Sequence, residues 1–154
     1  MDILSGSWPG ELFFFKGLAD HSFAAPEMLK DKDGQIINIG GGIEEQPDDQ
    51  GILIRGSVER ETTDEGKFVI YHGKRIKSTP EKPIATTGTA STVRAADWDG
   101  DGDYDLIVGN IDGDVYLIPN EGTTTSYVFG KEKQLQAAGH LLHVQSRAGP
   151  CAAD

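Results

Sequence analysis

Short apolar runs separated by glycine, proline and aspartate dominate the pattern of this chain. The clearest runs are two to four residues long: Ile3-Leu4, Leu12–Phe15, Ile52–Ile54, Phe68–Tyr71 and Leu106–Val108. Runs of this length, bounded by residues that favour turns, are typical of β-strands. The 20 glycines and seven prolines among 154 residues agree with this pattern, because a protein of short strands needs many turns. The sequence therefore predicts an all-β fold.

Two stretches of the sequence match each other without gaps, residues 2–17 and residues 105–120. The match pairs an aspartate, two glycines and the apolar positions. It continues downstream, where residues 22–29 fall near 128–135, residues 37–39 fall near 142–144, and residues 149–154 echo 92–97. A match of this kind indicates an internal repeat. We expect one repeat unit in residues 1–39, a second in 87–148, and the start of a further one in 149–154.

The repeat also decides two local assignments. Residues 130–138 have helical propensity, but the matching segment carries Pro26, which a helix interior does not tolerate well. We therefore expect both segments to be extended. Pro9-Gly10 and Asp112-Gly113-Asp114 each separate two apolar runs, and we expect both to be hairpin turns.

An acidic loop, Asp97–Asp105, carries aspartate at positions 1, 3, 5, 7 and 9 and glycine at positions 4 and 6. Calcium takes six to eight oxygen ligands at roughly 2.3–2.6 Å, and carboxylates on a turning backbone supply them. A solvated acidic turn is the alternative. An EF-hand is excluded, because it needs glutamate at position 12 and flanking helices, whereas Val108 stands there. We expect strands at 92–96 and 106–108 on either side of the loop.

The stretch from Ala95 to Asn110 resembles the FG-GAP/VCBS repeat, the blade unit of integrin-α-like β-propellers, whose loop follows D-x-D-x-D-G-x-x-D. The resemblance implies a partial β-propeller of about two antiparallel blades. It also implies a calcium site held by the side chains of Asp97, Asp99, Asp101 and Asp105 and by the main-chain carbonyl of Asp103.

The same alignment places Asp2 at the ninth position of an earlier loop and Asp154 at the first position of a later one. We therefore expect the chain to be a piece of a longer repeat protein.

Residues 40–86 have no counterpart in the second unit. They begin with a polar, glycine-rich stretch that includes the pairs Glu44/Glu45 and Asp48/Asp49, which we interpret as solvated loop rather than as acid–base pairs. Two apolar runs follow. We favour a β-hairpin inserted between the blades or lengthening one; the alternative is a binding loop on a rigid scaffold.

Charge and composition narrow the class of partner. The net charge of −11 argues against nucleic acid, because Lys67, Lys74, Arg75 and Lys77 form only a small basic cluster, which a solvated strand face explains. There is no apolar run of membrane-spanning length. Cys151 is a single cysteine, which excludes an intrachain disulfide framework, and its small neighbours favour a buried, inert thiol.

No catalytic motif is found in the sequence. His140 and His143 are three residues apart, so in a strand they would point to opposite faces. We therefore expect no enzymatic activity of this chain. The sequence predicts a calcium-binding structural or recognition scaffold whose full propeller binds a protein or carbohydrate ligand. We expect an extracellular, cell-surface or periplasmic location, since weak loops of this type saturate at roughly millimolar calcium.

Two alternatives remain. In one, the propeller is an accessory or support domain of a secreted enzyme, for example one acting on polysaccharide. In the other, the chain belongs to an intracellular repeat protein with a vestigial acidic turn, which would not respond to calcium.

Overall fold

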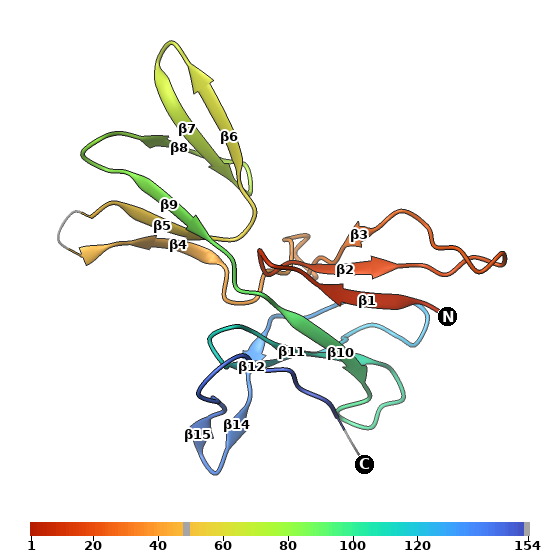
Figure 1. The fold of residues 1–154 in the computed structure, drawn as a ribbon. Coiled ribbons are helices and arrows are strands. Elements are labelled where there is room, and N and C mark those ends of the chain that lie inside the picture. The colour runs from red at the N-terminus through yellow and green to blue at the C-terminus, as the bar shows by residue number, and fades with distance from the viewer. Residues whose placement is uncertain (48–49, 153–154) are drawn as a thin grey trace.

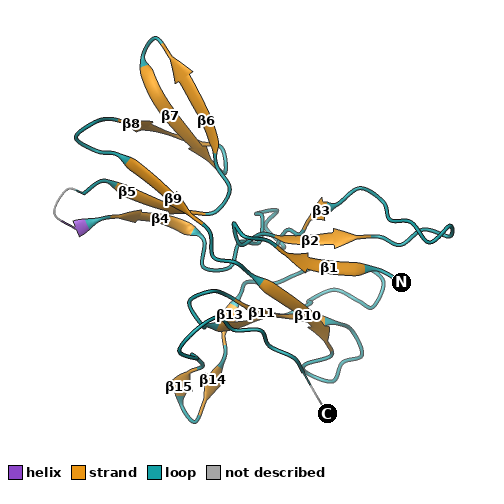
Figure 2. Cartoon of the chain, viewed as in Figure 1, coloured by secondary structure: helices purple, strands orange, loops and turns teal. Residues whose placement is uncertain are grey.

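The computed structural model of this chain is all-β, as the sequence predicts (Figure 1). It describes residues 1–47 and 50–152, which form several small, mainly antiparallel sheets with no closed barrel among them (Figure 2). No helix in this part of the chain is long and apolar enough to cross a membrane. The Asp48/Asp49 pair and Asp154 lie outside the described residues.

The first sheet holds three antiparallel strands in the order β1-β2-β3. Their bounds are β1 (Ile3–Gly6), β2 (Leu12–Phe15) and β3 (Glu27–Met28). The β1–β2 hairpin turns at Pro9-Gly10, as expected, and Gly10 has a φ of +107°, a region that favours glycine.

The second sheet is a four-stranded antiparallel meander in the order β10-β11-β12-β13. Its strands are β10 (Thr92–Ala96), β11 (Asp105–Gly109), β12 (Val115–Ile118) and β13 (Lys133–Gln134). A short hairpin follows, β14 (Gln136–Ala137) and β15 (His140–Leu141). The segment 130–138 is therefore extended, as predicted, and the Asp loop connects two strands, which agrees with the exclusion of an EF-hand.

The two sheets are built alike. Ile3 pairs with Phe15 in the first hairpin and Leu106 with Ile118 in the second. The third strands also agree, since Phe14 pairs with Glu27 and Leu117 with Lys133. Isolated bridges join Glu11 to Asn38 and Asp114 to His143. We call two positions equivalent when they occupy the same place in these two sets of pairings.

An apolar core lies between the first and second sheets. The first sheet and the segment after it contribute Leu12, Ile37 and Ile39, and the second sheet contributes a larger set: Val93, Leu106, Val108, Ile118 and Phe129. All of these side chains are buried. A separate, smaller cluster of Ile107, Val115 and Ala148 covers the opposite face of the second sheet. Strand β11 is therefore buried on both faces, which explains why its sequence is continuously apolar instead of alternating.

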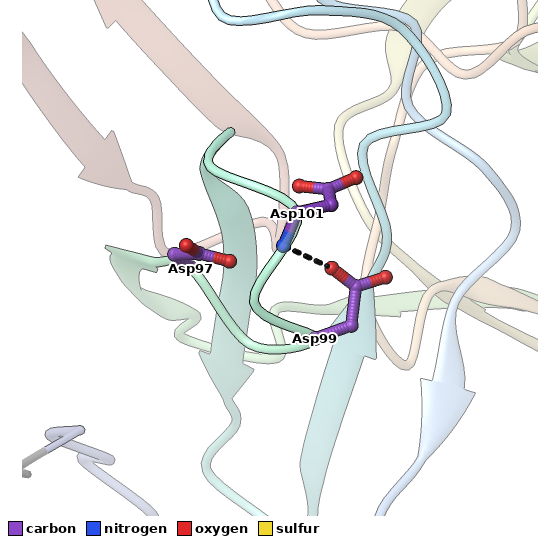
Figure 3. A group of neighbouring side chains, drawn as sticks. All are labelled: Asp97, Asp99 and Asp101. Carbon is purple, nitrogen blue, oxygen red and sulfur yellow. Dashed lines mark hydrogen bonds between the residues drawn. The ribbon is translucent and has the colours of Figure 1, made fainter.

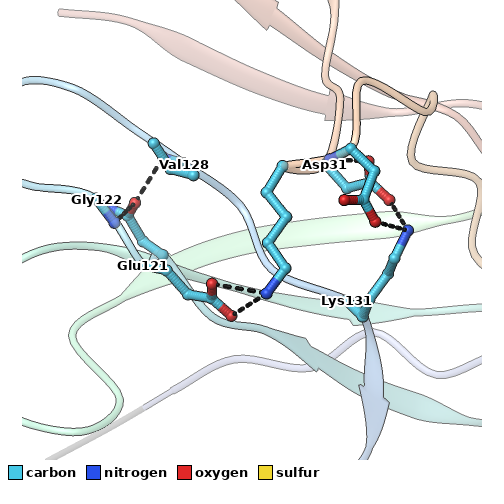
Figure 4. Close-up of polar contacts among 8 residues, drawn as sticks. Asp31, Glu121, Gly122, Val128 and Lys131 are labelled. Atoms are coloured by element: carbon cyan, nitrogen blue, oxygen red, sulfur yellow. Dashed lines mark hydrogen bonds and ion pairs between the residues drawn. The ribbon is translucent and has the colours of Figure 1, made fainter.

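Ion pairs join the two sheets at the rim of this core (Figure 4). Lys32 binds the Glu121 carboxylate with an Nζ–Oε2 distance of 2.9 Å. Lys131 contacts Asp31, and its Nζ lies 3.0 Å from Oδ2 of Asp33. The two aspartates raise the pKa of Lys131 to about 12. The ammonium of Lys131 in turn lowers the pKa of Asp31, whose carboxylate also accepts hydrogen bonds from the backbone of Asp33 and Gln35.

Residues 42–87 form a module of two three-stranded sheets with a core of their own, in place of a single hairpin. One sheet has the order β4-β5-β9 and the other β6-β7-β8. Their bounds are β4 (Gly42–Glu45), β5 (Ile52–Arg55), β9 (Ile84–Thr87), β6 (Glu59–Thr63), β7 (Gly66–Tyr71) and β8 (Lys74–Ser78). The two predicted apolar runs, in β5 and β7, supply the buried core of Ile52, Ile54, Val69 and Tyr71.

The basic cluster of the module lies on β7 and β8. The guanidinium of Arg75 lies 3.3 Å from the ring centroid of Phe68 and donates a hydrogen bond to Glu61. Phe68 is only 7% exposed. Arg75 therefore covers an aromatic ring and pairs with an acid, which is a structural role.

Cys151 is exposed, so the prediction of a buried thiol was wrong. Ala148, a few residues before Cys151, does reach the cluster beneath β11 and β12. Small size alone did not determine burial here, because no element of the described chain covers Cys151.

We expect Asp31→Asn to lower the melting temperature slightly at neutral pH. Asparagine keeps the backbone hydrogen bonds but removes the charge that faces Lys131. Because the pKa of Asp31 is lowered from 3.8 on folding, its contribution is complete above that value and is lost as the pH falls below it. Melting curves of both proteins from neutral to acid pH should therefore converge below pH 3.8, and a constant difference would contradict this account.

Candidate metal centre

The Asp loop, residues 97–105, turns between the end of β10 and the start of β11. Those two strands pair antiparallel, and the last pair before the loop is Ala96 with Asp105. Gly100 and Gly102 have φ values of +82° and +93°. A side chain is strained in this region, so the two glycines allow the backbone to curl back on itself.

Three carboxylates of this loop converge, those of Asp97, Asp99 and Asp101 (Figure 3). Each offers an oxygen, and the three oxygens lie within 4.8 Å of one another. Two oxygens on opposite sides of one calcium ion are about 5 Å apart, given the usual metal–oxygen distances. The group therefore matches the size of a single oxygen-liganded cation, and its side chains are exposed and accessible from solvent.

Backbone amides hold these carboxylates in place. Asp97 accepts hydrogen bonds from the N–H groups of Gly100, at 2.8 Å, and Gly102, at 3.1 Å. Asp99 accepts one from Asp101, and Asp101 accepts one from Asp103. Each bond fixes a side chain relative to the turn that follows it, so the loop orients its acids without help from other segments.

Asp103 is the unusual member of the loop, because its carboxyl group is buried. The residue is 5% exposed, and its Oδ1 has no hydrogen-bond partner. Burial raises the pKa of Asp103, and the charges of Asp101, Asp105 and Asp99 raise it further. A buried carboxylate among like charges is unfavourable without a counter-ion or a donor. A positive charge beside the Asp103 carboxylate would therefore lower this cost.

Asp105 has a different role, since both of its oxygens accept backbone hydrogen bonds. Oδ2 accepts from Trp98 N at 3.0 Å, and Oδ1 accepts from Asn120 N at 2.7 Å. The residue is 3% exposed. Asp105 therefore ties the start of the loop to the end of the β11–β12 hairpin. Its equivalent in the first sheet, Asp2, accepts from Gly17 N at 2.8 Å.

The structure thus divides the five aspartates predicted as ligands. Asp97, Asp99 and Asp101 form one group, whereas Asp103 and Asp105 stand outside it. Sequence reasoning assigned Asp103 a main-chain contact and missed the burial of its side chain. It also missed the backbone bonds of Asp105. Asp2 and Asp105 match in the internal alignment, and each accepts a backbone hydrogen bond from an equivalent residue, Gly17 or Asn120.

Comparisons with protein-family models, curated proteins and solved structures found no match to this chain.

We expect Asp105→Ala to destabilise the protein even when a chelator removes all divalent metal. Two backbone N–H groups lose their acceptor, and a buried unsatisfied donor costs about 1–3 kcal/mol. Urea unfolding should therefore show a loss of at least about 2 kcal/mol. Asp2→Ala is the matched control, since it removes one bond at an exposed position and should cost less. Equal effects of the two substitutions would refute the structural role of Asp105.

Proposed function

We propose that this chain is a calcium-binding segment of a β-propeller of the FG-GAP/VCBS type, which serves as a structural and recognition scaffold. The observation that carries the proposal is the convergence of three carboxylates within 4.8 Å in a loop whose spacing matches the repeat of that family. The all-β fold is compatible with it.

The architecture of the sheets supports the propeller. A propeller blade is a four-stranded antiparallel sheet, and β10 to β13 form such a meander. The first sheet has the pairings of the last three of those strands. The two sheets pack face to face through an apolar core, as neighbouring blades do. On this proposal, the module of residues 42–87 is an insertion between two blades.

The chemistry of the loop supports calcium. Its converging ligands are all carboxylate oxygens, which suit hard cations and not the soft metals that prefer sulfur or imidazole. A large, flexibly coordinated ion fits a loop of alternating acids and glycines better than magnesium, which demands a near-ideal octahedron. Burial raises the pKa of Asp103, and the ion would offset the further contribution of the neighbouring carboxylates.

Calcium bound to this loop would stabilise the folded state of the chain. By drawing together Asp97, Asp99 and Asp101, it would fix the connection between β10 and β11. A ligand that binds only the folded state stabilises that state by mass action. Loops of modest affinity saturate at about millimolar calcium, which supports an extracellular, cell-surface or periplasmic location.

The proposal is tested by calcium titration of the wild-type chain and of Asp101→Ala, with calorimetry and tryptophan fluorescence as readouts. Trp98 lies inside the loop, and its backbone N–H binds Asp105, so its emission should change on saturation. Asp101→Ala should weaken binding by roughly tenfold or more, because it removes one of the three converging carboxylates. Magnesium should compete poorly.

Asp112→Ala is the matched control. Asp112 is an exposed aspartate in the β11–β12 turn, where it faces Arg55 at 3.6 Å, and its removal should leave the affinity for calcium unchanged. A folded wild-type chain without any calcium response would reduce the loop to a solvated acidic turn. An equal loss of calcium affinity in Asp101→Ala and Asp112→Ala would show only that removing a negative charge weakens binding.

A further inference from the structure

The module of residues 42–87 lies at the end of the first and second sheets that carries the β1–β2 and β11–β12 turns (Figure 1). Its core of Ile52, Ile54, Val69 and Tyr71 has no residue in common with the core between the two sheets. Among the described residues, therefore, no apolar cluster spans the module and the sheets. Two units of one chain are expected to move relative to each other unless their interface is large and hydrophobic.

Two of the polar contacts between the module and the sheets are weak. Nδ2 of Asn38 donates to the Tyr71 hydroxyl at 3.4 Å, which is long for a hydrogen bond. The guanidinium of Arg55 lies 3.6 Å from the carboxylate of Asp112, and both side chains are partly exposed. An ion pair that solvent reaches contributes little to stability. Water can therefore replace both contacts when the module moves away from the sheets.

The contact between Glu11 and Ser57 is the strong one. Glu11 is buried, and its Oε1 accepts a hydrogen bond from the backbone N–H of Ser57 at 3.0 Å. Its Oε2 accepts one from Ser7 Oγ, which belongs to the same hairpin. A carboxylate is costly to bury unless donors surround it, and a hydrogen bond to an ionised group is stronger than a neutral one. The position of the module therefore depends on the N–H of Ser57, which water replaces when the module moves away.

Two short linkers join the module to the sheets, and both contain glycine. The first is Gly40-Gly41-Gly42, which follows Ile39, and the second is Gly88, which precedes Thr89. Ile39 and Thr89 are both fully buried, so the chain is fixed on the sheet side of each linker. A few residues can absorb the backbone rotation of a hinge, and glycine allows the widest range of backbone angles. The two linkers therefore confine rotation of the module to these glycines.

We propose that the module is a hinged unit that turns about these two linkers, and that Glu11 latches it in the closed position seen in the structure. The proposal rests on the polar contacts and the linkers and not on calcium. The equivalent of Glu11 in the second sheet is the shorter Asp114, whose carboxylate binds Gln134 and His143 instead. The longer acid therefore stands in the hairpin that faces the module.

Single-molecule energy transfer tests the latch, with dyes on Lys16→Cys, after β2, and Asp64→Cys, in the β6–β7 turn, in a chain that also carries Cys151→Ser. All three positions are exposed. The parent should show one closed distance and a minor open population. Glu11→Asp keeps the charge but is too short to reach Ser57, so it should raise the open fraction by roughly tenfold. The hairpin should still fold, because the second hairpin carries aspartate at the equivalent position.

Asp114→Glu is the matched control, because it lengthens the equivalent acid of the second hairpin and should leave the open fraction unchanged. Hydrogen exchange separates a hinge from unfolding. In Glu11→Asp the amide of Ser57 should exchange roughly tenfold faster or more, whereas the amides of β5 and β7 should keep their rates. An unchanged open fraction in Glu11→Asp overturns the proposal. Faster exchange throughout β5 and β7 also overturns it, since the module would then unfold instead of turning.

Discussion

Strand β11 keeps its place only when apolar surfaces cover both of its faces. All five of its residues are buried. Leu106 and Val108 pack against the first sheet, and Ile107 packs against the cluster that includes Val115 and Ala148. Because side chains of a strand alternate between faces, no single neighbour can satisfy both sides. The stacking of sheets in this molecule follows from that requirement.

The Asp loop depends on the same strand. Asp105 is both the last loop residue and the first residue of β11, and its carboxylate holds the N–H groups of Trp98 and Asn120. The position of the loop is thus set from the sheet side, whereas Asp97, Asp99 and Asp101 are oriented by the amides of the loop itself. Anything that draws those three carboxylates together acts directly on the β10–β11 connection. This coupling explains how a surface ion would influence the packing of a buried strand.

The elements with a strong local signal were predicted from sequence, and those defined by long-range contacts were not. The apolar runs predicted β5, β7 and β11, and the glycine-containing turns predicted the β1–β2 and β11–β12 hairpins. Strand β6 was missed, because ERETT is polar and becomes a strand only by pairing with β7. The interpretation of Glu44 and Glu45 as solvated loop was wrong for the same reason, since both residues lie in β4 and pair with β5. In the site, the spacing of the acids was visible, but the burial of Asp103 was not, because burial depends on neighbours distant in sequence.

The equivalent residues Glu11 and Asp114 make different contacts in the two sheets. Glu11 anchors the inserted module. Glu11 is 1% exposed, and its carboxylate accepts hydrogen bonds from Ser7 Oγ and from the backbone N–H of Ser57 in the module. Its equivalent, Asp114, is partly exposed and lies 3.0 Å from His143 Nδ1. A buried carboxylate must have donors. The module supplies one to Glu11, so the first hairpin and the insertion depend on each other, whereas the second hairpin satisfies its acid at the surface.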